Sequence, residues 1–156
     1  TVAVFLQVSG YTGSIPFAGR EPGSNGLAVD PRGRLVFCQH GDRRVVRREP
    51  DGRPTVLAER YQGKRLNSPN DLAFAPNGDL FGTTYGAIFL LRDADGDGFF
   101  SAAEITQWAD TRGNTSGNNC HIDVGGGFVY AGSETGVRRF AWAPGKASGI
   151  EGIPRP

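Results

Sequence analysis

Apolar and polar positions alternate in short runs along this chain, and turn-forming residues separate the runs. Segment 25–38 reads NGLAVDPRGRLVFC, an apolar run, a turn rich in Asp, Pro and Gly, and a second apolar run. The same order returns in 70–83 and 120–133, with starts 45 and then 50 residues apart. A strand–turn–strand unit that repeats every 40–50 residues predicts the blades of a β-propeller, each a four-stranded antiparallel sheet.

The pattern also places the individual strands. In the first unit it predicts strands at 26–30, 34–39, 43–49 and 54–59. In the second it predicts strands at 71–75, 79–83 and 85–92, followed by 104–109 as a strand or a short helix. In the third it predicts strands at 120–124, 127–132 and 136–142, with only a poor strand after them. Residues 2–8 lack the basic start of a signal peptide and are expected to form a lone strand.

Three blades are too few to close a ring, because propellers use roughly 4–8. An open array would also leave unpaired strand edges. We therefore expect an all-β half-propeller that forms one domain over residues 1–156. Either the chain is a fragment of a longer one, or two copies form a six-bladed homodimer. In the homodimer, which we favour, each copy would donate its N-terminal strand to the partner's last blade.

Composition agrees with an all-β chain and excludes some partners. Twenty-four glycines and ten prolines suit many tight turns. The net charge of +1 gives no reason to expect nucleic acid or an anionic membrane as a partner. No apolar run reaches the roughly 18 residues of a membrane span. Cys38 and Cys120 lie far apart and are expected to be free thiols, so a periplasmic, secreted or cytoplasmic location all remain open.

The stretch 93–104, DADGDGFFSAAE, matches the spacing of a twelve-residue calcium loop. Calcium takes six to eight oxygen ligands, and this spacing would supply them from one loop. The expected ligands are Asp93, Asp95, Asp97, the Phe99 carbonyl, Ser101 and Glu104, with Gly98 at the sharp turn. The preceding GAIFLLR is typical of a strand rather than an EF-hand helix. Calcium is therefore expected to stabilise a connection within a blade.

Polar clusters precede the first strand of each unit, where a propeller's central channel begins. Asn and Asp oxygens there can ligate a hard cation, and Arg with Asn can bind sugar-like hydroxyls. The alternative for each residue is a structural role in a turn. The candidate channel residues are Asn25, His40, Arg65, Asn67, Asn70, Asp71 and His121.

The stretch QGKRLNSPND (62–71), supported by CQHGDRRV (38–45), resembles the gluconolactonase/senescence-marker-protein family of six-bladed lactonases. The resemblance covers about residues 5–83. It implies a divalent metal in the channel that polarises a lactone carbonyl for attack by water, and it implies that Asn70, with Asp71 beside it, faces that channel. The family's early metal-binding glutamate and its later Asn and Asp ligands have no secure match in this chain.

Residues 84–156 are similar instead to the propellers of sorbosone and other quinone-dependent sugar dehydrogenases, which often carry a DxDGDG loop. In that comparison His121 is the one candidate for a quinone-binding residue. The leading expectation is a calcium-binding, lactonase-like hydrolase that acts on a sugar-lactone-like ligand. A non-catalytic binding scaffold and a remnant quinone-dependent dehydrogenase are the alternatives.

Overall fold

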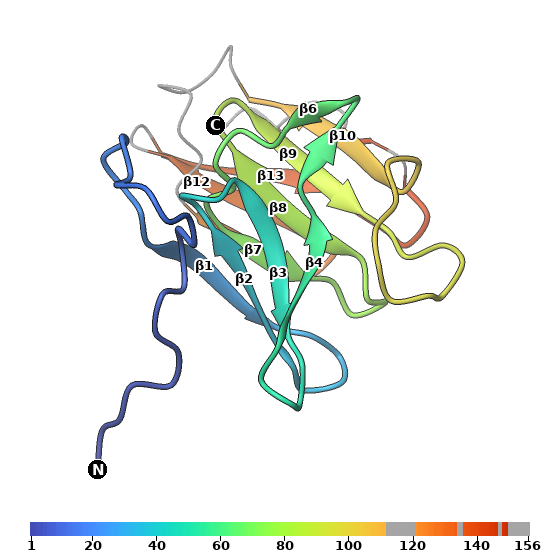
Figure 1. The fold of residues 1–156 in the computed structure, drawn as a ribbon. Helices are drawn as coiled ribbons and strands as arrows, with labels where there is room; N and C mark the ends of the chain where they lie inside the picture. The colour runs from blue at the N-terminus through green and yellow to red at the C-terminus, as the bar shows by residue number, and fades with distance from the viewer. Residues whose placement is uncertain (112–120, 134–135, 147, 150–156) are drawn as a thin grey trace.

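The computed structural model describes residues 1–111, 121–133, 136–146 and 148–149. In these residues the regular structure is antiparallel strand (Figure 1). The described chain contains no helix of the length and apolarity that a membrane crossing requires. Cys38 is buried as a free thiol, and Cys120 lies outside the described residues.

Two four-stranded sheets and one three-stranded sheet follow one another along the chain. The first sheet has the order β1 (Ser24–Val29), β2 (Leu35–Gln39), β3 (Arg44–Arg48) and β4 (Pro54–Ala58). The second sheet contains β7 (Leu72–Phe74), β8 (Leu80–Thr84), β9 (Ala87–Leu91) and β10 (Ile105–Asp110). The third sheet contains β11 (His121–Gly125), β12 (Phe128–Ser133) and β13 (Gly136–Ala141). Of the two forms expected for 104–109, β10 is the strand.

Two features of the N-terminal half differ from the prediction. Residues 2–8, expected to form a strand, belong to no sheet, and Val2, Val4 and Phe5 are exposed. Among the described residues no strand edge pairs with this segment, so it lacks the backbone partners that a strand needs. The structure also adds a hairpin of β5 (Arg60–Tyr61) and β6 (Lys64–Arg65), which the sequence pattern did not predict.

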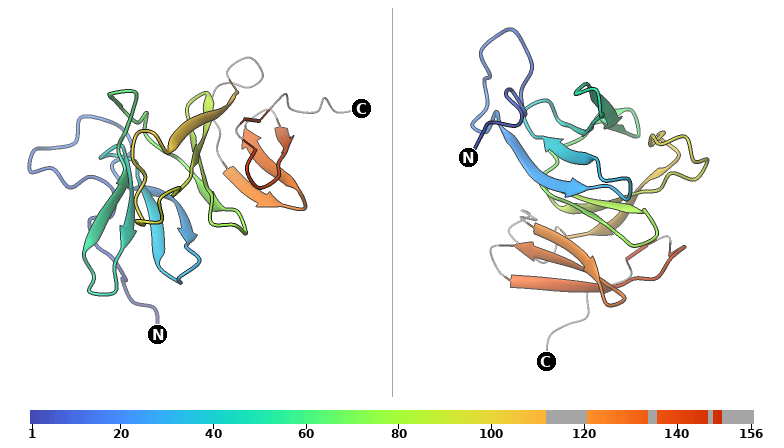
Figure 2. Two further views of the ribbon diagram at one scale, coloured as in Figure 1. Left: turned by 90° about the vertical axis from the view of Figure 1, so that its right-hand side faces the viewer. Right: turned by 90° about the horizontal axis from the view of Figure 1, so that it is seen from below.

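The three sheets lie side by side in chain order, with the second in the middle (Figure 2). Their first strands are neighbours, because β7 contacts both β1 and β11. Each sheet therefore presents its first strand to the inner side of the array, as propeller blades do. The described polar residues at the starts of the first two of these strands, Asn25 and Asn70, are brought together at one end of the inner side.

Both faces of the second sheet are buried, and successive residues of β8 serve opposite faces. Leu80 packs in an apolar cluster with Val36 and Cys38 of the first sheet. Phe81 packs in a second cluster with Val129 and Phe140 of the third sheet. Trp108 sits in this second cluster, with its ring centroid 5.1 Å from Phe81 and 5.8 Å from Phe140. The two inter-sheet layers thus form the core and fix the spacing of the inner strands.

The outer flanks of the array differ from this buried middle. On the far face of the first sheet Leu27 and Val29 are each 62% exposed. On the far face of the third sheet Val137 is 54% exposed, and Phe128 stacks under Arg139 at 4.7 Å. Both flanks of the array therefore expose apolar side chains, whereas the faces between the sheets are buried.

Candidate functional site at the inner strand ends

Three of the predicted channel residues form one hydrogen-bonded cluster. The Asn25 side-chain amide donates to Oδ1 of Asn70 over 2.7 Å. The same nitrogen lies 2.9 Å from Nδ1 of His40. Asn25 is the second residue of β1, the inner strand of the first sheet. Asn70 precedes β7, the inner strand of the second sheet, and His40 follows β2. Residues separated by up to 45 positions therefore meet at one end of the inner side.

This cluster fixes the tautomer of His40. An amide nitrogen can only donate, so Nδ1 of His40 accepts a hydrogen bond from Asn25. A neutral imidazole carries its single proton on the other nitrogen, which is Nε2. Nε2 lies 3.6 Å from Oε2 of Glu21. The imidazole N–H is thus directed toward a carboxylate at the edge of the cluster.

Glu21 is a member of the site that sequence reasoning missed. It lies in the irregular segment before β1, and 67% of its side chain is exposed. The available signal was its position four residues before Asn25 in REPGSN, where an isolated carboxylate approaches a predicted channel strand. That signal was overlooked because Glu21 belongs to no motif.

The backbone around Asn70 holds the cluster in place. Gly26 N donates to the Asn70 carbonyl over 2.6 Å, which joins the first sheet to the second. Asn70 N donates to the Thr83 carbonyl over 2.8 Å. Ser68 adopts a positive φ of 47°, and Pro69 follows it. This turn carries the chain from the β5–β6 hairpin into the inner strand, so Asn70 reaches the first sheet.

Asp71 performs a different task from its neighbour. Its Oδ1 accepts a hydrogen bond from Leu72 N and its Oδ2 one from Ile122 N, each over 2.9 Å. The second bond ties the third sheet to the second. Burial, with the charge of Asp71 second, raises the pKa of the Cys38 thiol, so that thiol stays protonated and inert. Asp71 is therefore a connector between sheets.

The other predicted channel residues lie elsewhere. Nδ1 of His121 is 3.7 Å from Oδ2 of Asp71, but its side chain is 86% exposed. Arg65 donates through Nη2 to the Asp42 carbonyl over 2.7 Å. Arg65 and Asn67 line a separate groove beside the β5–β6 hairpin. The structure thus joins Asn25, His40 and Asn70 directly, adds Glu21, and leaves Arg65 and Asn67 outside the cluster.

The acidic loop 93–104 brings three of its predicted ligands together. One carboxylate oxygen from each of Asp93, Asp95 and Asp97 lies within 4.8 Å of the other two, and all three residues are exposed. Asp93 accepts hydrogen bonds from the backbone N–H groups of Gly96 and Gly98. Gly98 has a φ of 84°, as expected of the residue at the sharp turn.

Glu104 closes the loop from its far end. Its two oxygens accept hydrogen bonds from Ala94 N over 2.7 Å and Ser101 N over 2.9 Å. The Ser101 hydroxyl, then the Ser101 and Ala94 backbone N–H groups, lower the pKa of Glu104. Phe99, whose carbonyl was the fourth predicted ligand, is 46% exposed in side chain. The loop backbone is therefore held in a closed form by its own carboxylates.

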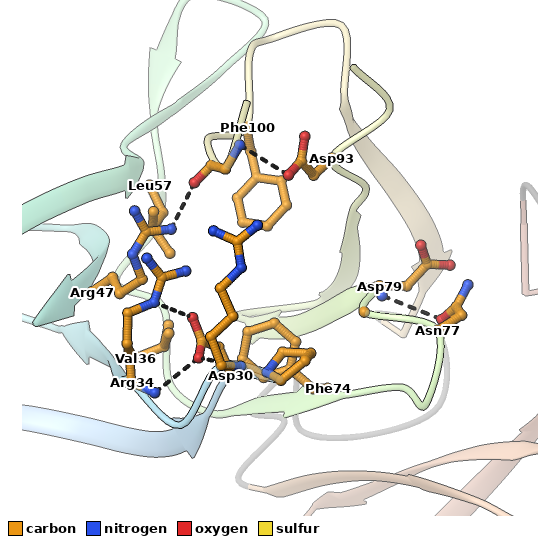
Figure 3. A pocket seen from close by; sticks show the side chains of 14 residues that line it. Asp30, Arg34, Val36, Arg47, Leu57, Phe74, Asn77, Asp79, Asp93 and Phe100 are labelled. Atoms are coloured by element: carbon orange, nitrogen blue, oxygen red, sulfur yellow. Dashed lines mark hydrogen bonds and ion pairs between the residues drawn. The ribbon is translucent and has the colours of Figure 1, made fainter. Parts of the chain in front are cut away.

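A cavity of about 220 Å³ separates this loop from the first sheet (Figure 3). Arg47 crosses it, donating from Nη1 to the Gly98 carbonyl over 2.7 Å and from Nε to Glu49 over 2.8 Å. Asp30 and Arg34 form an ion pair of 2.8 Å on the same wall. Burial raises the pKa of Asp30, but hydrogen bonds from Arg34 and the Arg32 backbone outweigh it, so the net pKa is lowered. The charged side chains of this wall form ion pairs with one another. The hydrogen bond from Arg47 to the Gly98 carbonyl connects the loop to the first sheet.

The sheets, their inner first strands and the cluster at one end define a β-propeller-like protein. Comparison with known proteins refines this class. The chain is 44% identical over 85 residues to a gluconolactonase of Zymomonas mobilis, which involves 53% of this chain and 24% of that protein. A scan against known family descriptions gives no match.

Solved structures give the same result over more than four fifths of the chain. A gluconolactonase from Xanthomonas campestris superposes with a TM-score of 0.64 at 27% identity, over 81% of this chain and 47% of that one. Virginiamycin B lyase from Staphylococcus aureus superposes with a TM-score of 0.53 at 16% identity, over 86% of this chain and 44% of that one, which shows the fold alone. The chain thus resembles a gluconolactonase-like propeller and spans less than half the length of these relatives.

Proposed function

We propose that the cluster of Glu21, Asn25, His40 and Asn70 is part of a site that hydrolyses a sugar lactone. The observation that carries the proposal is the contact of Asn25 with both His40 and Asn70 at the inner strand ends. The identity to a gluconolactonase supports it, since 85 residues align at 44%. Lactone opening by water needs a proton acceptor and hydrogen-bond donors near the carbonyl, and the cluster offers both.

The tautomer of His40 assigns the roles within the cluster. Because Nδ1 accepts from Asn25, the free proton acceptor is the Glu21 carboxylate rather than the imidazole. Water would lose a proton to Glu21 as its oxygen bonds to the lactone carbonyl carbon. The carbon–oxygen bond of the ring then breaks, and the ring oxygen takes that proton back from Glu21, which gives a hydroxy acid and restores the carboxylate. His40, through its Nε2–H, keeps the carboxylate in place.

The resemblance to metal-dependent lactonases implies a channel metal, and the described residues do not fit a complete site for one. Only the acidic loop places three or more His, Cys, Asp or Glu groups together in the described part of the chain. Both oxygens of Asp71 already accept backbone N–H groups. Asn70 and Glu21 could supply two oxygen ligands, and the remainder would have to come from blades beyond this chain. No catalytic step is therefore assigned to the metal.

Base consumption at constant pH during turnover of glucono-lactone, with and without added divalent metal, tests the proposal. Glu21→Gln and Asn70→Ala should each lower the rate at least ten-fold, while the matched control Glu59→Gln should leave it unchanged. A chain that binds the lactone without consuming base would instead support the non-catalytic scaffold.

We propose calcium as the ion of the acidic loop. Three carboxylates within 4.8 Å of one another repel without a cation, and oxygen is the ligand atom that calcium prefers. The loop backbone already has the positive φ of Gly96 and Gly98 that a tight ligand loop needs. Calcium here would strengthen the connection between β9 and β10 and would take no part in lactone chemistry.

We also propose that the ring is completed by a second copy of this chain. The exposed Leu27 and Val29 on one flank and Val137 on the other support this, as does coverage of 47% of a related propeller. The third sheet has three described strands, so β13 offers an edge for a fourth, which residues 2–8 of the partner could fill. Light scattering should give twice the 16.6 kDa chain mass. A stable monomer at the concentration used for the assay would rule out this partner.

A further inference from the structure

The β5–β6 hairpin encloses a groove of about 400 Å³ against the second sheet. Its walls are hairpin residues on one side and residues of β8, β9 and β10 on the other. Figure 1 shows the hairpin at the edge of the molecule, beside β9 and β10. The volume falls within the 300–1,000 Å³ of small-molecule sites. The groove belongs to the middle sheet, so packing of further blades on the two flanks would leave it open.

The charged residues that line the groove are all positive. Lys64 and Arg65 line it, and none of its lining residues is Asp or Glu. Lys64 forms no ion pair with any residue that the structure describes, and the hydrogen bond of Arg65 goes to a neutral carbonyl, that of Asp42. Arg34, Arg47 and Arg92, in contrast, each pair with a carboxylate. The two groove cations therefore keep their charge available for an anion.

The remaining walls suit the carbon skeleton of a sugar. Tyr61 and Phe89 meet edge to face at 5.0 Å, so their rings are held in place. Tyr85 is 58% exposed at the rim. Aromatic rings offer apolar faces to the C–H groups of a sugar, and the amides of Asn67 and Gln107 can bond its hydroxyls in either direction.

The hairpin turn fixes this arrangement. Gln62 and Gly63 both have positive φ, 50° and 76°, which is the geometry of a two-residue type I′ turn. The turn pairs Tyr61 directly with Lys64. Paired residues project from the same face of a hairpin, so an aromatic ring and an ammonium group stand side by side at the groove.

We propose that this groove binds a small sugar derivative that carries an anionic group, either a carboxylate or a phosphate. The anion would sit at Lys64 and Arg65, and the polyol would lie along Tyr61 and Tyr85. This binding stands apart from the proposed lactone hydrolysis, because its residues are not those of the channel cluster.

NMR titration of the ¹⁵N-labelled chain tests the proposal. The ligands are gluconate, glucose 6-phosphate, glucose and inorganic phosphate, at matched ionic strength. We expect saturable shifts for gluconate or glucose 6-phosphate within 61–67 and 84–89. Glucose and inorganic phosphate should each bind at least five-fold more weakly. Lys64→Gln/Arg65→Gln should weaken the binding of the anionic sugar at least five-fold, and the matched control Arg32→Gln/Arg53→Gln should not.

Four outcomes would overturn the proposal. The first is no saturable shift with either anionic sugar. The second is equal weakening in the control variant, which would indicate net charge alone. The third is inorganic phosphate binding as tightly as glucose 6-phosphate, which would indicate an adventitious ion only. Shifts confined to Asn25 and Asn70 would place the ligand in the channel and would also contradict it. A chain that hydrolyses no lactone leaves this titration interpretable.

Discussion

The side-chain amide of Asn25 donates to Oδ1 of Asn70 over 2.7 Å, and this bond joins two successive sheets at their inner ends. Because the same amide also contacts His40, one side chain sets both the position of Asn70 and the tautomer of the imidazole. The consequences can be measured separately for activity, packing and stability.

Asn25→Ala removes both contacts, so His40 and Asn70 lose their common donor. We expect lactone hydrolysis to fall at least ten-fold, with a loss of about 1–2 kcal/mol in the free energy of unfolding. Rates from base titration and stability from urea denaturation give the two numbers. Asn77→Ala is the control, since Asn77 accepts a single backbone hydrogen bond from Asp79 in a turn of the second sheet. Equal activity loss in both variants would show that the effect is structural.

Gly26→Ala should separate the first two sheets. A Cβ at this position would overlap the Cα and Oδ1 of Asp71 and the carbonyl of Asn70. The backbones must therefore move apart, and we expect a loss of about 1–3 kcal/mol, the usual cost of overpacking. Gly33→Ala is the control. A Cβ at Gly33 would meet no other atom, but φ is 79°, so this variant measures the cost of backbone strain without overpacking. Unchanged stability in Gly26→Ala would contradict the close approach of β1 to Asn70.

Asp71→Asn tests the tie between the second and third sheets. The substitution replaces one carboxylate oxygen by an NH2 group, which can only donate. The single remaining oxygen can serve Leu72 N or Ile122 N, but not both as the carboxylate does. A buried N–H left unpaired costs about 1–3 kcal/mol. Hydrogen exchange at Ile122 should accelerate more than exchange at Val46, which lies in the first sheet. Uniform acceleration throughout the chain would mean that the tie is not local.

Asp30→Asn should make stability less dependent on pH. Hydrogen bonds hold the net pKa of Asp30 below its ordinary value of 3.8, so its carboxylate stabilises the fold above that pH. The contribution disappears as pH falls through the lower folded pKa. We expect the wild type to exceed the variant by about 1–3 kcal/mol at pH 7, and the difference to shrink below about pH 4. Urea denaturation at pH 3 to 7 measures it. A difference that is constant with pH would exclude the carboxylate as its source.

Calcium should raise the melting temperature if the acidic loop binds it. At 100-fold excess over the dissociation constant, binding adds about 2.7 kcal/mol. For a chain of this size that corresponds to roughly 5–10 °C. Calorimetry with calcium and with chelator gives the shift, and Asp93→Asn/Asp97→Asn should abolish it. Asp51→Asn/Asp123→Asn is the charge-matched control. No shift in the wild type would leave the loop as a hydrogen-bonded turn.

The alternation of apolar and polar residues predicted most strands because each sheet buries regular faces. Leu80 and Phe81 illustrate this, since neighbouring residues enter different cores. The β5–β6 hairpin escaped prediction because strands of two residues carry no periodicity. Residues 2–8 form no strand within this chain, because their composition suits a strand but pairing needs a partner edge. Donation of this segment to a second copy stays a prediction.

The sequence also predicted most residues of the site, but not the contacts between them. Asn25, His40 and Asn70 were found because each stands beside a predicted strand. Their mutual contacts depend on the angle between sheets, which no local pattern contains. Glu21 lies in irregular chain, so its approach to His40 follows only from the path of that segment. Arg65 and Asn67 share a motif with Asn70, yet the turn at Ser68 and Pro69 separates them from the cluster, and they line the groove beside the β5–β6 hairpin.

The bonds from Gly26 to Asn70 and from Ile122 to Asp71 run between successive units through just two residues of one motif. A gene that gained or exchanged a unit would have to preserve this pair at every new junction. A further unit joined in the same way would need its own Asn–Asp pair at the innermost edge, so this pair limits which units can be added to the array.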